Sequence, residues 1–470
     1  MRSWQHVVRT AMALLAITLA ANPATADELD RYVAQERRVY LLPAVVLGVI
    51  RDGRLTERRA QGLANVELGV AANTRHAFEI GSISKQFTAY AILILREQGR
   101  VELDAPVGRY LPGLPQTWAV VPLHRLLTHT SGLPDLEEAF GYGLYRETPD
   151  DDSFLKRIAA LPVLFPPGEK WHYSNTNYWL LARVIELQSG LSYADFMQKK
   201  VFEPLRMRST RSALPTRLLA GRASGYRRVG AVLENRDPIQ PHTGRGLGDI
   251  VSTLADMARW EREQLAPRLV SPASAALARQ PVLLNDGKPE AYGYGWSTEK
   301  ILPALPVATL SHDGQTAGFT ASYIRIPSRR LAVVVFTNAY GAPVDSLAKA
   351  ALGHADSSLR TPRPRAIADT QQQLTQRAHE LLRGGASADR DWREDWFGSD
   401  YWAQLRPWLA EVAEFHQRLG TLRSLTLVGR EAQADTTRLT YRAVYPTLSR
   451  LLTLGFDAQG RITSRDAVDE

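Results

Sequence analysis

Phe78-Glu-Ile-Gly-Ser-Ile-Ser-Lys-Gln-Phe87 is the most informative stretch of this chain, because it places Ser82 three residues before Lys85. From Ser84 the apolar residues recur at helical spacing, and the pattern stops at Gly99, a residue typical of the position just past a helix end. Residues three apart on a helix share a face, so Lys85 can reach Ser82. A serine hydroxyl becomes a nucleophile when a neighbouring base accepts its proton, and this stretch predicts such an activated serine.

The Ser-x-x-Lys spacing is weak evidence by itself, since it occurs four times in the chain. The first pair is distinguished by its context: Gly81 allows a tight turn, and the following amphipathic helix presents its positive end to a developing anion. The alternative is a surface serine beside a solvated lysine. We expect the other three pairs to be accidental: Ser153/Lys156, Ser297/Lys300 and Ser346/Lys349.

A second motif, Tyr173-Ser-Asn175, follows a Pro-Pro-Gly turn and directly precedes a helical pattern. Asn175 or Thr176 could therefore simply be the amino cap of that helix, and Tyr173 could be a core ring. The functional interpretation needs the lysine as well. A phenol close to the Lys85 ammonium loses its proton more readily and can serve as a base.

The His-x-Gly pattern occurs twice, and its position favours His312-Asp-Gly314. This copy ends one predicted strand and precedes another, so its backbone would form an edge along which a substrate amide could pair. His242 lies in an irregular stretch and is predicted to be a loop residue. His124 and His129 have no carboxylate partner nearby in the sequence, and we expect them to be structural.

The length and composition of the chain limit the number of domains and the classes of ligand that we expect. A chain of 470 residues exceeds the usual size of a single core, which favours two domains. The net charge of +8 comes from basic residues scattered among acidic ones, so nucleic acid is not an expected partner. There is no cysteine, and the sequence contains no zinc-protease motif and no phosphate-binding loop. We therefore predict no metal and no cofactor.

Residues 1–26 have the features of a signal peptide: two arginines, an apolar run from Ala11 to Ala21, and Ala24-Thr25-Ala26 before a cleavage point. The alternative, a membrane anchor, is disfavoured because the run is well short of the roughly 20 residues that span a bilayer. We predict a mature chain that starts at Asp27, is periplasmic or secreted, and has no stable membrane anchor.

The strand and helix patterns predict an α/β (α+β) fold with an antiparallel sheet. An apolar run from Pro43, the turn pair Asp52-Gly53 and the residues to Leu68 read as a hairpin. A helical lobe is expected between about 105 and 265. Further strands are predicted at Tyr292–Thr298, Val307–Ser311, Phe319–Ile326 and Leu331–Thr337.

The stretch Arg360-Thr-Pro-Arg-Pro-Arg365 has the composition of a linker, and the order of predicted helices and strands changes after it. After it come helical patterns at Asp369–Arg383 and Tyr401–Leu419 and then three alternating strands, around Leu422–Val428, Thr437–Tyr445 and Leu451–Phe456. This is the order of an α+β domain. Tyr401, Trp402 and Trp408 could line a pocket there, although aromatics at helical spacing are more often core. The predicted boundaries are 27–359 for the catalytic domain, 360–368 for the linker and 369–470 for the C-terminal domain, whose role the sequence does not indicate.

With these motifs assembled, the chain resembles the serine β-lactamase and penicillin-binding protein superfamily. The similar branch contains class C β-lactamases, DD-carboxypeptidases, D-aminopeptidases and related esterases, and the match covers roughly residues 35 to 355. Five more stretches carry the resemblance: Leu126-Leu-Thr-His-Thr-Ser-Gly-Leu133, Phe165-Pro-Pro-Gly168, Tyr173-Ser-Asn-Thr-Asn-Tyr178, Val251-Ser-Thr-Leu-Ala-Asp256 and Phe336-Thr-Asn338.

The resemblance implies an active site between the sheet domain and the helical lobe. Ser82 would be the nucleophile that becomes acylated, and Lys85 and Tyr173 would share the work of general base. The resemblance also implies the substrate-binding groups: Asn175 for the substrate amide, His312 on the opposite wall, Gly314 in the third motif, and the backbone N–H groups of Ser82 and Gln315 as the oxyanion hole.

One departure bears on the substrate. β-Lactamases of this branch carry Lys-Thr-Gly as the third motif, whereas this chain has His312-Asp-Gly314, so the fixed cation is missing. We therefore expect an exported serine hydrolase that cleaves an amide or ester, peptidase-like, carboxypeptidase-like or esterase-like, acting on a small molecule or a peptide, including a cell-wall peptide. The alternative is a noncatalytic sensor or cell-wall-fragment binding protein that keeps the same pocket.

Overall fold

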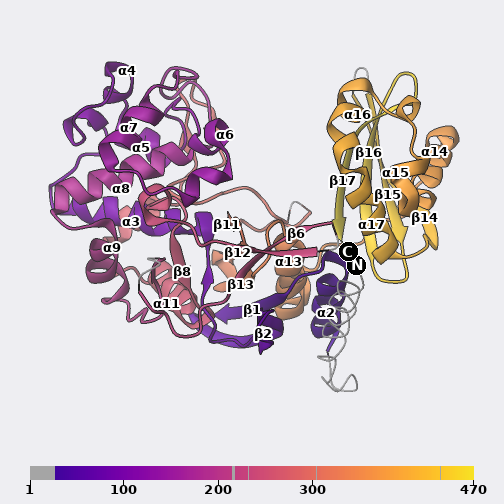
Figure 1. Ribbon diagram of the computed structural model, residues 1–470, viewed down its shortest axis with the longest axis horizontal. Coiled ribbons are helices and arrows are strands. Elements are labelled where there is room, and N and C mark those ends of the chain that lie inside the picture. The colour runs from indigo at the N-terminus through magenta and orange to yellow at the C-terminus, as the bar shows by residue number, and fades with distance from the viewer. Residues whose placement is uncertain (1–26, 214–216, 231, 303, 434–435, 470) are drawn as a thin grey trace, which may run out of the picture.

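The computed structural model combines helices and antiparallel strands, which confirms the expected fold class (Figure 1). The predicted signal peptide, residues 1–26, lies outside the described residues, so the structure does not test it. None of the helices in the described part of the chain has the length and apolar character needed to cross a bilayer. The structure describes residues 27–213, 217–230, 232–302, 304–433 and 436–469.

A six-stranded antiparallel sheet, in the order β11-β12-β13-β1-β2-β3, forms the centre of the larger part of the molecule. Its strands come from both ends of that part, as the sequence predicted. The β1–β2 hairpin turns at Asp52 and Gly53, whose φ angles of 51° and 70° suit a type I′ turn. The strands are β1 (Ala44–Arg51), β2 (Arg54–Asn65), β3 (Val70–Ala71), β11 (Leu310–Thr316), β12 (Phe319–Ile326) and β13 (Leu331–Thr337).

Helices cover both faces of this sheet, and β1 is buried on both sides for that reason. Successive side chains of a strand point to opposite faces. Val45 therefore packs with α2 (Glu28–Tyr40) and α13 (Val344–Ala355), whereas Val46 joins the core that contains α3 (Ser84–Glu97) and α11 (Leu254–Leu265). A continuous apolar run is what a strand covered on both faces requires.

The helices of the predicted lobe are present, and α3 connects the lobe to the sheet (Figure 1). Two small sheets interrupt this region: β4-β8-β5 beside the start of α3, and the hairpin β6-β7. The lobe helices are α4 (Gln116–Ala119), α5 (Leu123–Leu127), α6 (Leu136–Phe140), α7 (Asp151–Ala159), α8 (Asn175–Ser189), α9 (Tyr193–Phe196) and α10 (Pro241–Gly244), and the small strands are β4 (Phe78–Glu79), β5 (Arg211–Ser212), β6 (Gly225–Val229), β7 (Val232–Arg236) and β8 (Ile250–Ser252).

The strand predicted at Tyr292–Thr298 is wrong. Only isolated bridges form there, between Tyr292 and Ser297 and between Ser297 and Ser311. The reason is a tight loop at Gly295, which has a φ of 73° and passes so close to α3 that a Cβ atom would lie 2.8 Å from the backbone nitrogen of Gln86. The next strand also differs from expectation. β11 starts at Leu310 and continues to Thr316, so His312 lies inside this strand and not at its end.

The C-terminal part has its own hydrophobic cluster and a four-stranded antiparallel sheet in the order β14-β15-β16-β17. The predicted helix Tyr401–Leu419 is broken, because Pro407 lies between α16 and α17. The fourth strand, β17, was not predicted. The elements are α14 (Gln372–Arg383), α15 (Ala388–Asp391), α16 (Ser399–Leu405), α17 (Leu409–Leu419), β14 (Ser424–Gln433), β15 (Thr436–Val444), β16 (Ser449–Asp457) and β17 (Ile462–Asp469).

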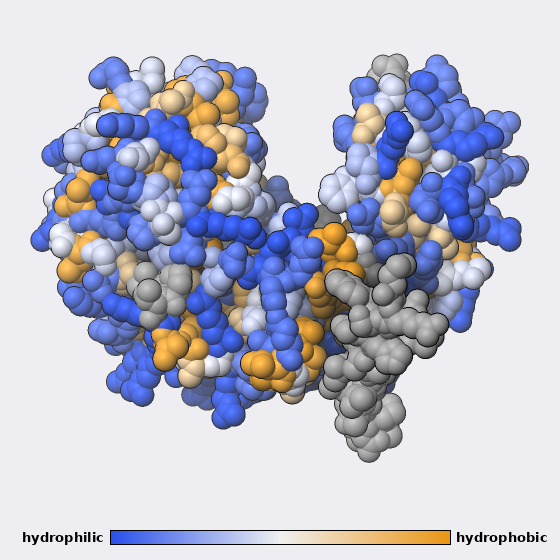
Figure 2. Space-filling view, in the orientation of Figure 1, coloured by the Kyte–Doolittle hydropathy of each residue, from blue (hydrophilic) through white to orange (hydrophobic). Residues whose placement is uncertain are grey.

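Helix α2 links the two parts of the molecule. Val39 is buried in the C-terminal cluster, the ring of Tyr40 lies 5.3 Å from that of Phe415, and Arg418 Nε donates to the Val39 carbonyl at 2.8 Å. Tyr401 and Trp402 pack against the C-terminal cluster, as core residues would, while Trp408 is exposed. On the face shown in Figure 2, the surface is hollowed between the helical lobe and the C-terminal part. The domain boundaries drawn from the sequence stay predictions.

Candidate active site

Ser82 and Lys85 lie at the junction of a short 3-10 turn, Gly81–Ile83, and α3. Ser82 is half-buried and reaches the cavity, whereas Lys85 is buried. Lys85 Nζ donates to Ser82 Oγ at 2.9 Å, to Asn175 Oδ1 at 2.8 Å and to the Leu247 carbonyl at 3.0 Å. Three acceptors around one amine hold Nζ against the serine hydroxyl.

Burial lowers the pKa of Lys85 from 10.5 to about 7. The cause is loss of hydration of the ammonium, which the carboxylates of Asp135 and Glu137 oppose but do not cancel. Close to neutral pH a large share of the amine is therefore uncharged. An uncharged amine 2.9 Å from a serine hydroxyl is able to accept the serine proton.

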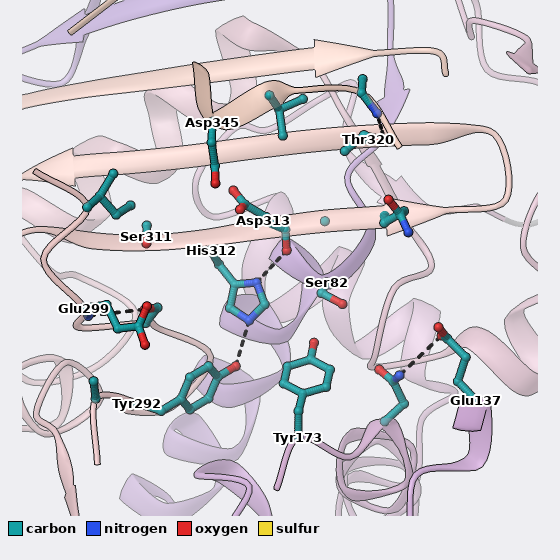
Figure 3. Close-up of a pocket in the computed structure, with 18 of the residues that line it drawn as sticks. Ser82, Glu137, Tyr173, Tyr292, Glu299, Ser311, His312, Asp313, Thr320 and Asp345 are labelled. Atoms are coloured by element: carbon teal, nitrogen blue, oxygen red, sulfur yellow. Dashed lines mark hydrogen bonds between the residues drawn. The ribbon is translucent and has the colours of Figure 1, made fainter. Parts of the chain in front are cut away.

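Tyr173 points toward Ser82 from the lobe side of the cavity (Figure 3). Lys85 Nζ lies 4.8 Å from the centre of its ring. Burial raises the pKa of Tyr173 well above its ordinary value, although a hydrogen bond with Ser82 acts in the opposite direction. This differs from the expectation that the nearby lysine would make the phenol more acidic. Desolvation, together with the Asp135 and Glu137 carboxylates, decides the direction, so the phenol stays protonated and is placed to donate a proton.

Asn175 is the first residue of α8, but its side chain does not cap that helix. Its Oδ1 accepts from Lys85, and its Nδ2 donates to Asp135 Oδ2 at 3.2 Å. The same Asp135 oxygen accepts the Asn175 backbone N–H at 3.0 Å, so Asp135 satisfies the helix terminus. The capping alternative is therefore wrong for Asn175, whose amide faces the lysine and the cavity.

His312 forms the opposite wall of the cavity, on β11. Its Nδ1 donates to the Asp313 carbonyl at 2.6 Å, and its Nε2 accepts from the Tyr292 hydroxyl at 2.7 Å. Burial, helped by repulsion from Lys85, lowers the pKa of His312 to about 3. Both hydrogen bonds suit the neutral imidazole, so the third motif carries no cation at any pH near neutral.

Gly314 lets β11 touch the turn that carries Ser82. A Cβ atom on Gly314 would lie 1.8 Å from the Ile80 carbonyl oxygen and 3.0 Å from the Ser82 backbone nitrogen. A Cβ atom on Gly81 would lie 2.4 Å from the Gln315 backbone nitrogen. Direct backbone contact therefore brings the Ser82 and Gln315 nitrogens to neighbouring positions. This is the arrangement that an oxyanion hole requires.

These residues surround a cavity of about 690 Å³, and Figure 3 shows Ser82, Tyr173 and His312 turned toward it. A smaller cavity of about 30 Å³ shares Ser82 and Asn175 with the first one. In the described ranges no group of three or more His, Cys, Asp or Glu side chains has the geometry of a metal site. The structure thus brings together all the candidate residues of the three motifs: Ser82, Lys85, Tyr173, Asn175, His312, Gly314 and Gln315.

Sequence reasoning missed the position of His129. Its buried ring lies 4.2 Å from the ring of Tyr173 and 5.0 Å from that of Tyr292, so it supports both walls of the cavity. Its Nδ1 accepts the Ser174 backbone N–H at 3.1 Å. Its φ of 57° is unusual for a residue with a side chain. No signal in the local sequence indicates these contacts, because the partners lie more than 40 residues away.

The other sequence candidates lie elsewhere or act differently. His242 is on the short helix α10, where its carbonyl accepts from Trp179 Nε1. Ser153 donates its backbone N–H and its hydroxyl to the carboxylate of Asp150, which caps α7. Ser297 lines the cavity, but Lys300 is exposed and does not. Among the four Ser-x-x-Lys pairs, all of which lie in the described residues, Ser82 and Lys85 are the pair in which the lysine amine is hydrogen-bonded to the serine hydroxyl.

A family model described as Beta-lactamase matches residues 29–356, and the chain belongs to this family. Three relatives are Penicillin-binding protein 4* of Bacillus subtilis (33% identical over 284 residues, 56% of this chain and 61% of that one), D-aminopeptidase of Gluconobacter oxydans (29% over 314 residues, 63% and 56%) and Esterase EstB of Burkholderia gladioli (36% over 214 residues, 42% and 53%). The chain thus spans less than two thirds of the length of each.

The structure of an octameric penicillin-binding protein homologue from Pyrococcus abyssi has the same fold, with a TM-score of 0.62 at 21% identity over 94% of this chain and 98% of that one. The resemblance inferred from the motifs is confirmed by these comparisons.

Proposed function

We propose that this chain is an exported serine hydrolase that cleaves an amide or ester bond through an acyl intermediate on Ser82. The observation that carries the proposal is the buried Lys85 amine, 2.9 Å from Ser82 Oγ and with its pKa lowered to about 7. The nucleophile of such a reaction needs a base within hydrogen-bond reach. Here the base and the hydroxyl are already in contact.

The geometry supports a specific proton path. Neutral Lys85 accepts the proton of Ser82 as Oγ bonds to the substrate carbonyl carbon, and the resulting oxyanion faces the N–H groups of Ser82 and Gln315. Tyr173, which is still protonated, gives its proton to the leaving amine or alcohol as the carbonyl–leaving-group bond breaks. The lysine proton then restores the phenol. Water then takes the place of the leaving group and attacks the acyl carbonyl carbon. The proton transfers run in the reverse order, and Ser82 is released as the acyl–oxygen bond breaks.

The third motif argues against substrates that depend on a free carboxylate there. His312 is neutral, and Asp313 beside it supplies no positive charge in either protonation state, so a β-lactam or peptide carboxylate has no cationic partner at this wall. Among the relatives, D-aminopeptidase and Esterase EstB support D-amino-acid amides, peptides and esters as substrates for this chain. Efficient β-lactamase activity is not part of the proposal.

Mass spectrometry after incubation with a fluorophosphonate or a penicillin tests the acyl-serine step. We expect one adduct, on Ser82, and none in Ser82→Ala. An adduct on another residue, or turnover by Ser82→Ala at the wild-type rate, would overturn the proposal. A folded protein that binds cell-wall fragments without any adduct or turnover would instead support the noncatalytic sensor. The substrate panel comprises D-amino-acid amides, D-Ala-D-Ala peptides, nitrocefin and short-chain nitrophenyl esters.

Export is the second element of the proposal, and it depends on residues 1–26. The structure offers indirect support: Asp27 accepts the Asp30 backbone N–H at 2.8 Å and so caps α2, which means that cleavage after Ala26 leaves this helix complete. Amino-terminal sequencing of the protein recovered from the periplasm or medium should start at Asp27. A full-length chain that stays in the cytoplasmic fraction would contradict export.

A further inference from the structure

The cavity that contains Ser82 has an unbalanced charge. Its lining includes five carboxylates, and among the described residues it includes no lysine or arginine. Glu137 is engaged, because it accepts from the Tyr145 hydroxyl at 2.9 Å. The other four belong to the wall around His312: Glu290, Glu299, Asp313 and Asp345.

Glu290 and Glu299 are available for a ligand, whereas Asp313 and Asp345 interact with each other. Within the described ranges, neither Glu290 nor Glu299 forms a salt bridge, and both line the cavity together with Tyr292. Asp313 points to Asp345 across the edge of the sheet (Figure 3), and Lys349 acts on Asp313 without lining the cavity. Part of the Asp313 side chain reaches solvent, yet desolvation and the Asp345 carboxylate raise its pKa to about 7.

Aromatic rings lie in the same wall as the carboxylates. The Trp171 and Tyr292 rings are 5.9 Å apart, both line the cavity, and Trp171 is 38% exposed although it is large and apolar. The face of an aromatic ring attracts a cation, and the attraction grows when the cation is partly desolvated. Carboxylates next to such rings complement an ammonium or guanidinium group. They repel a substrate carboxylate.

The excess of carboxylates is smaller on the opposite side of Ser82. The smaller cavity is lined by Glu137, which the two cavities share, and by Arg146, which pairs with Asp237 at 3.5 Å. The negative charge is therefore greatest in the larger cavity, on the side of His312. His312 cannot offset it, since both of its nitrogens are engaged as those of a neutral ring.

We infer that the preferred substrate carries a cationic group, an ammonium or a guanidinium, which lies against Trp171 and Tyr292 among Glu290, Glu299 and Asp313 while the scissile carbonyl sits at Ser82. This inference rests on the proposed hydrolase function and adds the charge of the substrate to it. The cation belongs either to the acyl part or to the leaving group, and the experiment separates the two.

The test compares matched substrates that differ only in side-chain charge. One series places the charge in the acyl part: the p-nitroanilides of Nα-acetyl-D-lysine, Nα-acetyl-D-norleucine and Nα-acetyl-D-glutamate. The other places it in the leaving group: N-acetyl-D-alanyl conjugates of lysinamide, norleucinamide and glutamate α-amide. In at least one series we expect kcat/KM for lysine to exceed that for norleucine by about tenfold, with glutamate slowest. Equal rates for lysine and norleucine in both series would overturn the inference.

Variants locate the effect. Glu299→Gln and Asp313→Asn should each reduce the ratio of lysine to norleucine, and added salt should reduce it as well. Glu102→Gln, an exposed carboxylate that pairs with Arg109 on the lobe, should leave the ratio unchanged. If the ratio of lysine to norleucine keeps its wild-type value in both Glu299→Gln and Asp313→Asn, the assigned position of the substrate cation is wrong. Failure of the proposed function is a distinct result, because then no substrate, including neutral p-nitrophenyl butyrate, is turned over.

Discussion

At the scale of single residues, the site depends on how burial acts on two different groups. Lys85 and Tyr173 are both buried, and desolvation disfavours the charged form of each. For the lysine this lowers the pKa and creates a neutral amine, a base. For the tyrosine it raises the pKa and preserves a neutral phenol, an acid. One environment therefore produces both partners of a proton relay around Ser82.

This difference predicts a pH dependence. Lys85 must be uncharged to accept the Ser82 proton, so kcat/KM for an uncharged nitrophenyl ester should be full above its folded-state pKa and fall as the pH drops through about 7. At pH 6 we expect about one tenth of the plateau value, since about one tenth of the amine is then neutral. Rate measurements between pH 5 and 9 check this, and a flat profile would contradict it.

Asp313 has a pKa raised to a similar value, so the assignment to Lys85 needs a control. Asp313→Asn removes that titration and leaves the lysine in place. The fall below pH 7 should persist in this variant if the lysine is responsible. A profile that becomes flat in Asp313→Asn would assign the pH dependence to the carboxyl group.

At the scale of elements, the site depends on the contact between β11 and the turn before α3. The two backbones touch at Gly81 and Gly314, because neither glycine carries a Cβ atom that would separate them. The contact brings the N–H of Ser82, from the turn, beside the N–H of Gln315, from the strand. Neither element alone contains both donors of the oxyanion hole.

Gly314→Ala should break this contact. The new Cβ would overlap the Ile80 carbonyl at 1.8 Å, so strand and turn must move apart. Loss of an oxyanion donor lowers kcat by about 100- to 1,000-fold, and the overlap destabilises the fold by about 1–3 kcal/mol. Kinetics and thermal melting measure both effects. The control is Gly398→Ala in the C-terminal part, where the new Cβ first meets the Thr463 side chain at 3.3 Å, and kcat should not change.

At the scale of the whole molecule, the C-terminal part packs against α2 and meets the β6–β7 hairpin through Arg228 and Glu414, and among the described residues its hydrophobic cluster includes none that line the cavity. The Phe415 ring is central to this contact, since it lies 5.3 Å from the Tyr40 ring and 5.0 Å from the Arg450 guanidinium. The interface joins the first described helix to the last part of the chain. We therefore expect activity and attachment of the C-terminal part to be separable.

Phe415→Ala should weaken the attachment without altering the chemistry. Removal of the ring is expected to destabilise the protein by about 1–3 kcal/mol and to lower the melting temperature, while kcat/KM stays within about twofold of wild type. Trp408→Ala is the matched control, because that ring is 54% exposed and its removal should leave the melting temperature unchanged. A large loss of activity in Phe415→Ala would show that the C-terminal part does act on the site.

Local patterns in the sequence were enough for the Ser82–Lys85 pair, for the β1–β2 hairpin at Asp52-Gly53 and for most strands of the central sheet. Each depends on residues close together in the chain, through helical spacing, turn chemistry or alternation. The pattern failed at Tyr292–Thr298, where packing of Gly295 against α3 outweighs strand propensity. It also missed β17, because the run Thr463–Asp466 is polar throughout and shows no alternation of apolar and polar residues, although the burial of the side chains does alternate along the strand.

By itself, then, the sequence determined which residue types the site contains and which family the chain resembles. The tertiary structure decided their states: the lowered pKa of Lys85, the neutral imidazole of His312, the orientation of Asn175 toward the lysine, and the place of His129 beneath Tyr173. The physical reason is that hydration and hydrogen-bond partners are properties of a three-dimensional environment. That environment is made by segments that lie tens to hundreds of residues apart in the chain.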